Sequence, residues 1–378
     1  MGKTVSSGKK PKFHHYPFWS PRFWHGMRLR SWMKLAASHR FRIHPLRMPM
    51  AVLIFFCCIF NSILYRIQRY VYGRRIDEVE IEHPPIFIIG HWRSGTTFLH
   101  ELMARDSQFA FPTTYECFVP HHFMLTRGLM TRFGGWLLPR KRPMDNMAAA
   151  WDRPQEDEFA LCAQGVGSPY LRMAFPNDEP DGMEFLDMRD VAADDLAEWK
   201  AAMLNFARAV TLNRPKRLML KSPPHTGRIE VLSELFPGAM FVHISRNPYS
   251  IFPSTQRLWR ALDRVQGLQL PKHANLDEYI FTCLERMYGG YEAQREKIDP
   301  SQLVEVAYEQ LVADPLGELR RIYDHLGLEG FAEAKSGFEE HLDDQKDYQT
   351  NRHDLDPNLK SEIHARWAGY FERYGYEP

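Results

Sequence analysis

Short apolar runs separated by stretches of helical periodicity recur between residues 84 and 326. The clearest run, Ile-Phe-Ile-Ile at residues 86–89, is bounded by two prolines and a glycine. A continuous apolar run of this length is typical of a strand buried on both faces of a parallel sheet. Three later runs are similar, and each precedes a helical pattern: runs 217–221, 240–245 and 303–307, helices 226–236, 248–263 and 315–326. This alternation predicts an α/β fold in three layers, with a central parallel sheet between two layers of helices.

Two segments depart from this alternation. Residues 120–215 break the rhythm and predict a helical insertion that caps the site. Residues 1–75 combine basic and aromatic side chains with an apolar helix and predict an N-terminal helical arm. We therefore expect residues 76–378 to form one α/β domain, to which the arm is attached.

The arm differs from the rest of the chain in charge. Residues 1–50 contain eleven Lys and Arg and no Asp or Glu, although the whole chain has a formal net charge of only +1. An unbroken apolar run follows at residues 50–60, and it is shorter than the ~20 residues that span a bilayer. The basic charge and the apolar run together predict that the arm forms an interfacial helix on an anionic membrane surface. The alternatives are a spanning helix and a helix that packs on the core or on a second subunit. No recognised nucleic-acid-binding module is present, so we expect no nucleic-acid partner.

Composition narrows the class of protein further. Apolar residues make up 44% of the chain and charged residues 25%, so a sizeable core can form. The five cysteines form no Cys-x-x-Cys pair, which disfavours a zinc ribbon or a disulfide framework. The first apolar run begins too late for a signal peptide. We expect a cytoplasmic protein, with the arm as a candidate peripheral contact to the membrane.

The strongest local motif is Gly-His-Trp-Arg-Ser-Gly-Thr-Thr at residues 90–97, between a predicted strand and a predicted helix at 96–105. Glycines let the backbone approach an anion, and the N–H groups at a helix start donate to it. Thr96 stands where a nucleoside triphosphatase loop has its lysine, and the nearest cation is Arg93. The strand at 240–245 ends in Ser245 and not in a magnesium-binding aspartate. These features predict a P-loop-like phosphate site and argue against the rival class, a P-loop kinase or triphosphatase.

A second anion site is predicted at the end of the strand at 240–245. Arg246 follows that strand, and Ser254 lies eight residues further on, in the next predicted helix. An arginine fork and a hydroxyl together suit a phosphate. Two separate anion sites predict a nucleotide that is phosphorylated at both ends.

With these motifs, residues 76–378 resemble the sulfotransferases that use 3′-phosphoadenosine 5′-phosphosulfate. The chain is most similar to a bacterial branch with Arg-Ser-Gly-Thr-Thr loops, whose motifs are like those of tyrosylprotein sulfotransferases. The resemblance implies that Arg246 and Ser254 hold the 3′-phosphate, and that no metal is required. It also implies that the 5′-phosphosulfate is held by the loop residues Arg93, Ser94, Gly95, Thr96 and Thr97. Phe98 and Tyr308 are candidates for the adenine contact, with core packing as the alternative for each.

Sulfuryl transfer needs positive charge at the leaving phosphate and a base for the acceptor. Arg93 and Lys221 are our candidates for the charge. For the base, two candidates stay open: Glu116, which resembles the glutamate of the tyrosylprotein branch, and His225. The segment Lys-Ser-Pro-Pro-His at 221–225 places this histidine two residues later than the cytosolic enzymes do, which keeps the assignment open.

Other features of the sequence leave their roles open. The acidic cluster at residues 152–158 suits a helix start, with substrate positioning as the alternative. The segment at 347–352 is a candidate to close on the nucleotide, with Lys346 or Arg352 near a phosphate. The acceptor is expected to be a small-molecule or lipid-like alcohol, although a carbohydrate or peptide stays open, and so does a homo-oligomer. A non-catalytic membrane-associated binding protein is the second rival.

Overall fold

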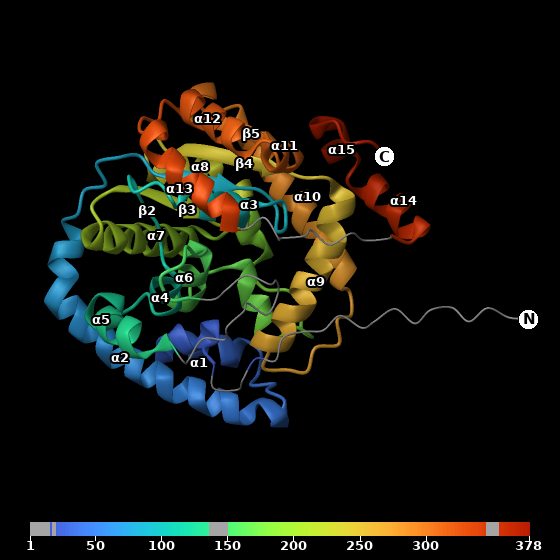
Figure 1. The fold of residues 1–378 in the computed structure, drawn as a ribbon. Coiled ribbons are helices and arrows are strands. Elements are labelled where there is room, and N and C mark those ends of the chain that lie inside the picture. Colours follow the sequence, from blue (N-terminus) through green and yellow to red (C-terminus); the bar gives the residue numbers. More distant parts are fainter. Residues whose placement is uncertain (1–15, 17–19, 136–149, 345–354) are drawn as a thin grey trace, which may run out of the picture.

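The computed structural model describes residues 16, 20–135, 150–344 and 355–378 (Figure 1). Within them, a five-stranded sheet has the order β2-β3-β1-β4-β5, and every pairing is parallel. Its strands are β1 (Ile86–Ile89), β2 (Phe109–Ala110), β3 (Arg217–Lys221), β4 (Met240–Ser245) and β5 (Leu303–Ala307). The predicted α/β class with a central parallel sheet is confirmed. β2, only two residues long, has no counterpart among the sequence predictions.

β1 lies at the centre of the sheet, between β3 and β4. Ile86 is in register with Met219 on one side and with Met240 on the other. All four residues of β1 are buried, because helices cover both faces of the sheet. Ile86 and Ile88 belong to one hydrophobic cluster, while Phe87 and Ile89 belong to the other. The period-two alternation of a strand thus divides the core into the two halves of a three-layer fold.

Two groups of helices cover the sheet. One face carries α3, α11, α12 and α13, and the other carries the long helices of the insertion and of the later chain (Figure 1). The first group is α3 (Thr96–Met103), α11 (Tyr308–Ala313), α12 (Pro315–Leu326) and α13 (Phe331–Asp344). The second includes α7 (Ala193–Asn213), α8 (Ile229–Leu235), α9 (Pro248–Gln266) and α10 (Leu276–Arg295). The chain closes with α14 (Pro357–Arg366) and α15 (Ala368–Tyr374).

The described part of residues 120–215 is mainly helical, and α7 packs against the sheet itself. The shorter helices before and within this segment are α4 (Thr114–Phe118), α5 (Phe123–Phe133), α6 (Asp157–Gln164), η4 (Pro169–Met173) and η5 (Met183–Leu186). Two further 3₁₀ turns, η6 (Pro223–Gly227) and η7 (Pro300–Gln302), flank strands β3 and β5.

The N-terminal arm packs into the same core as the α/β domain. Its elements are η1 (Phe23–Gly26), α1 (Leu29–Ser38), η2 (Pro45–Arg47) and α2 (Met48–Asp77). Phe23 and Trp24 are buried in the larger hydrophobic cluster. Gly26 lies so close to the backbone carbonyl of Phe118 that a Cβ atom would overlap it. The helix predicted from the run at 50–60 extends over 30 residues as α2.

Candidate active site

The phosphate loop joins the end of β1 to the start of α3. Gly90 and Gly95 have φ angles of 142° and 113°, in the left-handed region that glycine tolerates best. A Cβ on Gly90 would lie 2.4 Å from the carbonyl oxygen of Ile244, and one on Gly95 would lie 2.3 Å from Cδ2 of Tyr308. Arg93, between them, also has a positive φ of 71°. Packing and backbone conformation therefore both require the two glycines that the motif contains.

The loop holds a polar group that is ready for a ligand. Gly95 is the N-cap residue of α3, and it has no side chain with which to cap the first N–H groups of this eight-residue helix. Ser94 is fully buried, and within the described structure its Oγ lacks a hydrogen-bond partner. A buried hydroxyl without a partner is costly unless a ligand satisfies it. The loop therefore fits an anion bound at the start of α3.

The second predicted anion site lies directly against this loop. Arg246 Nη1 donates to the carbonyl oxygen of Arg93 at 2.9 Å, and Arg93 Nε donates to Ser254 Oγ at 2.9 Å. The Arg246 guanidinium also stacks over the Tyr308 ring, 4.1 Å from its centroid. These contacts form because β1 and β4 are neighbours, at the point where the strand order reverses. Such a switch point is the usual ligand site of an open α/β sheet.

Three other predicted binding residues lie near this switch point. Thr96 is buried in the first turn of α3, and Thr97 follows it. Phe98 is partly buried and packs against the cluster under α3, as the core-packing alternative requires.

Lys221 ends β3 and is almost completely buried. Its Nζ donates to Glu156 Oε1 at 2.8 Å and lies 3.4 Å from Thr97 Oγ1 at the start of α3. Lys221 therefore contacts the phosphate loop on one side and a carboxylate on the other. Glu156 was not singled out from the sequence, where it was one of several acidic residues at a helix start.

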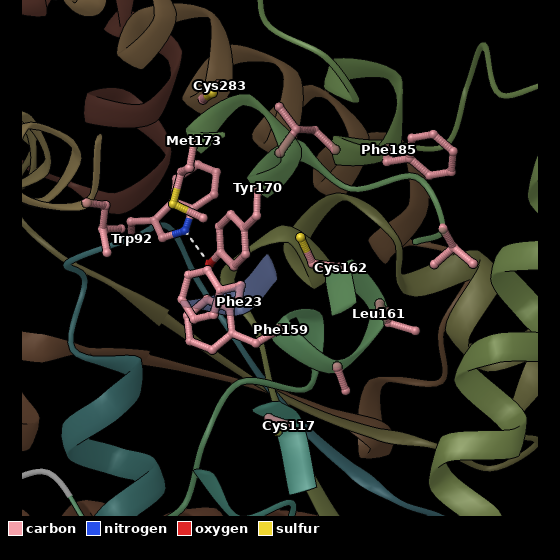
Figure 2. Packing of buried hydrophobic residues seen from close by; sticks show 14 of the residues in the cluster. Phe23, Trp92, Cys117, Phe159, Leu161, Cys162, Tyr170, Met173, Phe185 and Cys283 are labelled. Carbon is pink, nitrogen blue, oxygen red and sulfur yellow. Dashed lines mark hydrogen bonds between the residues drawn. The ribbon is translucent and has the colours of Figure 1, made fainter. Parts of the chain in front are cut away.

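Glu156 is held in place by a chain of aromatic side chains. Tyr170 donates its hydroxyl proton to Glu156 Oε2 at 2.5 Å. Trp92 Nε1 in turn donates to the Tyr170 oxygen at 2.7 Å (Figure 2). Burial and the charge of Glu156 raise the pKa of Tyr170 well above its usual value. Tyr170 thus stays protonated and remains a donor to the carboxylate.

The two acidic residues that follow form a buried network with β3 and η6. Asp157 Oδ2 lies 2.5 Å from His225 Nε2, and Glu158 Oε2 accepts from Arg228 Nη1 at 2.5 Å. These four side chains are fully buried. Burial opposes ionisation of Asp157, but the charge of His225 and its hydrogen bond outweigh that effect and lower the pKa. The acidic cluster does lie at the start of α6. Its last three members, Glu156, Asp157 and Glu158, also pair in that order with Lys221, His225 and Arg228.

Glu116, one predicted base, lies in a different set of contacts. Its carboxylate caps its own helix by accepting from the Thr113 N–H at 2.9 Å. Arg214 donates to both carboxylate oxygens, at 2.9 and 2.6 Å, and Asn213 donates at 3.1 Å. These contacts tie α4 to the end of α7. Lys346 and Arg352, the other predicted contacts, lie outside the described residues.

These features define an α/β protein whose two predicted anion sites meet at the switch point of the parallel sheet. The model of the Sulfotransferase family matches residues 84–333. Proteins named omega-hydroxy-beta-dihydromenaquinone-9 sulfotransferase Stf3, from Mycobacterium bovis and Mycobacterium tuberculosis, are each 42% identical to this chain over 359 residues. That match covers 95% of this chain and 92% of each relative. The chain therefore belongs to the sulfotransferase family, as the sequence motifs predicted.

Solved structures agree on the fold. Sulfotransferase STF9 from Mycobacterium avium superposes with a TM-score of 0.73 at 17% identity, covering 92% of both chains. Sulfotransferase STF1 from Mycobacterium tuberculosis gives a TM-score of 0.64 at 21% identity, covering 90% of this chain and 92% of that one. The family makes the chain an enzyme of sulfuryl transfer, and the roles of individual residues remain predictions.

Proposed function

We propose that this enzyme transfers a sulfuryl group from 3′-phosphoadenosine 5′-phosphosulfate to the hydroxyl of a lipid-like acceptor. The observation that carries the proposal is the direct contact between the two predicted anion sites. Arg246 donates to the backbone of Arg93, and Arg93 donates to Ser254. A donor with one phosphate on each side of its nucleoside would satisfy both sites at once.

The residues present fit this donor. The N–H groups at the start of α3 and the buried Ser94 hydroxyl supply donors for the 5′-phosphosulfate. Arg246 and Ser254 supply a cation and a hydroxyl for the 3′-phosphate. Tyr308, stacked on Arg246 and packed over Gly95, is placed to contact the adenine ring of the donor. Within the described residues no group of metal-ligating side chains occurs, and we expect full turnover in the presence of EDTA.

In the proposed reaction the acceptor oxygen forms a bond to sulfur while the bond from sulfur to the bridging phosphate oxygen breaks. The products are a sulfate ester and adenosine 3′,5′-bisphosphate, and the acceptor proton passes to a base. Lys221 and Arg93 supply fixed positive charge near the leaving oxygen. Lys221 is suited to this role because it is buried at the end of a strand, 3.4 Å from Thr97.

For the base, the contacts favour a residue that the sequence did not single out. His225 and Glu116 are each engaged in contacts that tie structural elements together, His225 with Asp157 and Glu116 with Arg214. Glu156 instead pairs with Lys221, which also contacts the phosphate loop. When Lys221 turns to the phosphosulfate, the Glu156 carboxylate gains the capacity to accept a proton. We therefore propose Glu156 as the base, with Glu116 and His225 as the alternatives.

The lipid-like acceptor follows from the relatives. The two relatives at 42% identity are named for an omega-hydroxy-beta-dihydromenaquinone-9, a menaquinone-derived alcohol. Because the match covers nearly all of both chains, we propose an acceptor of the same class. The five cysteines are free, as suits a cytoplasmic enzyme acting at the membrane.

Calorimetry tests the donor. We expect adenosine 3′,5′-bisphosphate to bind wild-type protein without metal and more tightly than adenosine 5′-monophosphate. Arg246→Ala should remove most of that preference, a loss of roughly tenfold to 100-fold for a charge-assisted contact. Arg260→Ala, an exposed arginine on α9, serves as the matched control and should bind like wild type. A preference for magnesium-ATP, or an unchanged preference in Arg246→Ala, would contradict the proposal.

A comparison of isosteric variants tests the base. Glu156→Gln should lower kcat by about 100-fold or more while adenosine 3′,5′-bisphosphate still binds. If Glu116→Gln or His225→Gln instead shows the selective loss of kcat at normal stability, that residue is the base. Turnover with Glu156→Gln close to that of wild type would exclude Glu156.

A further inference from the structure

Helix α2 has two apolar faces, and only one of them is covered by protein. It runs along the outer side of the molecule, with α1 and α5 on its inner side (Figure 1). Its inner face is buried and includes Met50, Ile54, Cys58 and Ile76. The outer face exposes apolar side chains at helical spacing: Val52, Phe55, Phe56, Phe60, Ile63, Ile67, Tyr70 and Val71.

The exposure of this outer face is large. Phe56 is 62% exposed, Phe60 58% and Ile63 54%. Residues 48–65 contain no Asp, Glu, Lys or Arg, so the exposed stripe is uncharged from Val52 to Ile63, and Arg66 and Arg69 fall only in its last turns. A contiguous apolar surface of this kind marks a site of association. By length and composition alone, Pro45–Asp77 is long and apolar enough to cross a membrane. Only 28% of its most apolar stretch is buried within the protein.

Polar contacts of the inner face hold α2 along the protein body. Asn61 Nδ2 donates to the carbonyl oxygens of His25 and Met27, at 2.6 and 2.9 Å. About two turns on, Gln68 Oε1 accepts from the N–H of Met124 at 3.0 Å. A helix that crossed the bilayer would have to break these bonds and bury the polar groups in hydrocarbon. The inner contacts therefore favour a helix that lies along a surface.

Cations lie at both ends of the uncharged stripe. Arg40 precedes α2 and is exposed next to the half-exposed Phe41. Arg66 and Arg75 follow the uncharged part of the stripe and are also exposed, and among the described residues neither belongs to an ion pair. Arg69 and Arg74 pair with acidic residues of the same helix end. An apolar stripe between cations is complementary to the acyl boundary and headgroups of an anionic bilayer.

The same charges disfavour a second copy of the chain on this face. A two-fold interface would place α2 against a copy of itself. Because both ends of the stripe are cationic, like charges would face each other in either helix orientation. We propose that the outer face of α2 docks on the surface of an anionic membrane, with its aromatic and aliphatic side chains inserted at the interface. This deepens the proposed function, since the lipid-like acceptor of that proposal would reside in the same membrane.

Flotation of the full-length protein with lipid vesicles tests the docking surface. We expect wild type to bind phosphatidylcholine vesicles that contain phosphatidylglycerol, and to bind pure phosphatidylcholine more weakly. The triple variant Phe56→Ser, Phe60→Ser, Ile63→Ser should lose at least about 100-fold in affinity, because three apolar side chains no longer insert. The control is Val312→Ser, which replaces an exposed apolar residue on α11 by serine in the same way. This variant should bind like wild type.

A separate variant tests how much the cations of α2 contribute to vesicle binding. Arg66→Gln with Arg75→Gln should weaken binding to anionic vesicles by roughly tenfold or more and leave binding to neutral vesicles unchanged. Sedimentation velocity without lipid is measured on the same samples. Absence of vesicle binding by wild type would overturn the proposal, as would a wild-type dimer that the triple variant dissociates.

Two further readouts separate this proposal from the proposed function. The triple variant should retain wild-type binding of adenosine 3′,5′-bisphosphate and wild-type sulfation of a short-chain, water-soluble alcohol. Failure of wild type in those two assays would count against the proposed donor and chemistry, while the vesicle result would still decide the docking surface.

Discussion

Substituting Glu158 by glutamine perturbs a fully buried charge without changing the size of the side chain. Glu158 accepts from both terminal nitrogens of Arg228, at 2.5 and 3.1 Å, and from Ser168 Oγ at 2.6 Å. An arginine guanidinium is a cation with five N–H donors and no acceptor. The remaining partners of Arg228 are the carbonyl oxygen of Phe185, His225 Nδ1 at 3.4 Å and the face of the Trp199 ring, 5.2 Å from the guanidinium carbon. The variant thus leaves a buried cation without its counter-ion.

The expected cost is large. At an effective dielectric constant of about 20, two charges ~4 Å apart interact by about 4 kcal/mol. Removing one partner of a buried pair typically costs about 3–5 kcal/mol. We expect Glu158→Gln to lower the free energy of unfolding by that amount. This is a substantial share of the roughly 5–15 kcal/mol that stabilises a native protein.

Urea unfolding followed by tryptophan fluorescence measures the effect. The control is Glu230→Gln, in the Glu230–Lys297 pair, whose side chains are 52% and 57% exposed. That pair should contribute no more than about 1 kcal/mol. The double variant Glu158→Met with Arg228→Met should recover part of the loss, because no unpaired charge remains. Equal losses for Glu158→Gln and Glu230→Gln would refute the reasoning.

Three further changes test other contacts. Gly95→Ala should weaken binding of adenosine 3′,5′-bisphosphate by roughly tenfold or more in calorimetry, because a positive φ and the ring packed on this glycine exclude a Cβ; wild-type affinity would show that the loop tolerates a side chain. Asn61→Leu should cost about 1–3 kcal/mol and speed hydrogen exchange in α2, since two buried carbonyls lose their donor; unchanged exchange would contradict this. Burial of His39 opposes protonation, but hydrogen bonds to Asp181 and Asp178 outweigh it and raise the pKa above 6.5. The His39 contribution is then present at pH 6 and lost as pH rises through the raised pKa, so His39→Gln should lower Tm at pH 6 and much less at pH 9; a constant difference would contradict the assignment.

The sheet could be predicted from the sequence because its signals are local. β1 is four apolar residues between a proline pair and a glycine, and β3, β4 and β5 begin and end where their apolar runs do. β2 could not be predicted, since two residues carry no period. The candidate phosphate loop and Arg246 could be singled out for the same local reason, and their roles are predictions. Each lies immediately after a recognisable strand.

The parts that escaped prediction depend on distant partners. Glu156 and Lys221 are 65 positions apart, and nothing local distinguishes a glutamate that pairs with a buried lysine from one that begins a helix. The basic side chains at positions 221, 225 and 228 lie opposite three consecutive acidic residues, 156–158. This spacing is the one signal in the sequence that could have suggested the buried ion-pair network. α2 is longer than the apolar run at 50–60 because the helix continues through Asn61 and Gln68. Both polar side chains face inward and satisfy backbone groups of other elements.

A row of packed aromatic side chains connects the arm to Glu156, the proposed base. Phe23 of the arm stacks on Phe159, with ring centroids 4.2 Å apart, and Phe159 lies 5.2 Å from the Tyr170 ring (Figure 2). Tyr170 in turn holds Glu156. Deleting the arm would therefore disturb the carboxylate of the proposed base as well as the surface of α2, and loss of activity on truncation would not distinguish the two effects. Substitutions confined to the outer face of α2 leave this stack intact, so only they can separate attachment to a membrane from the chemistry of sulfuryl transfer.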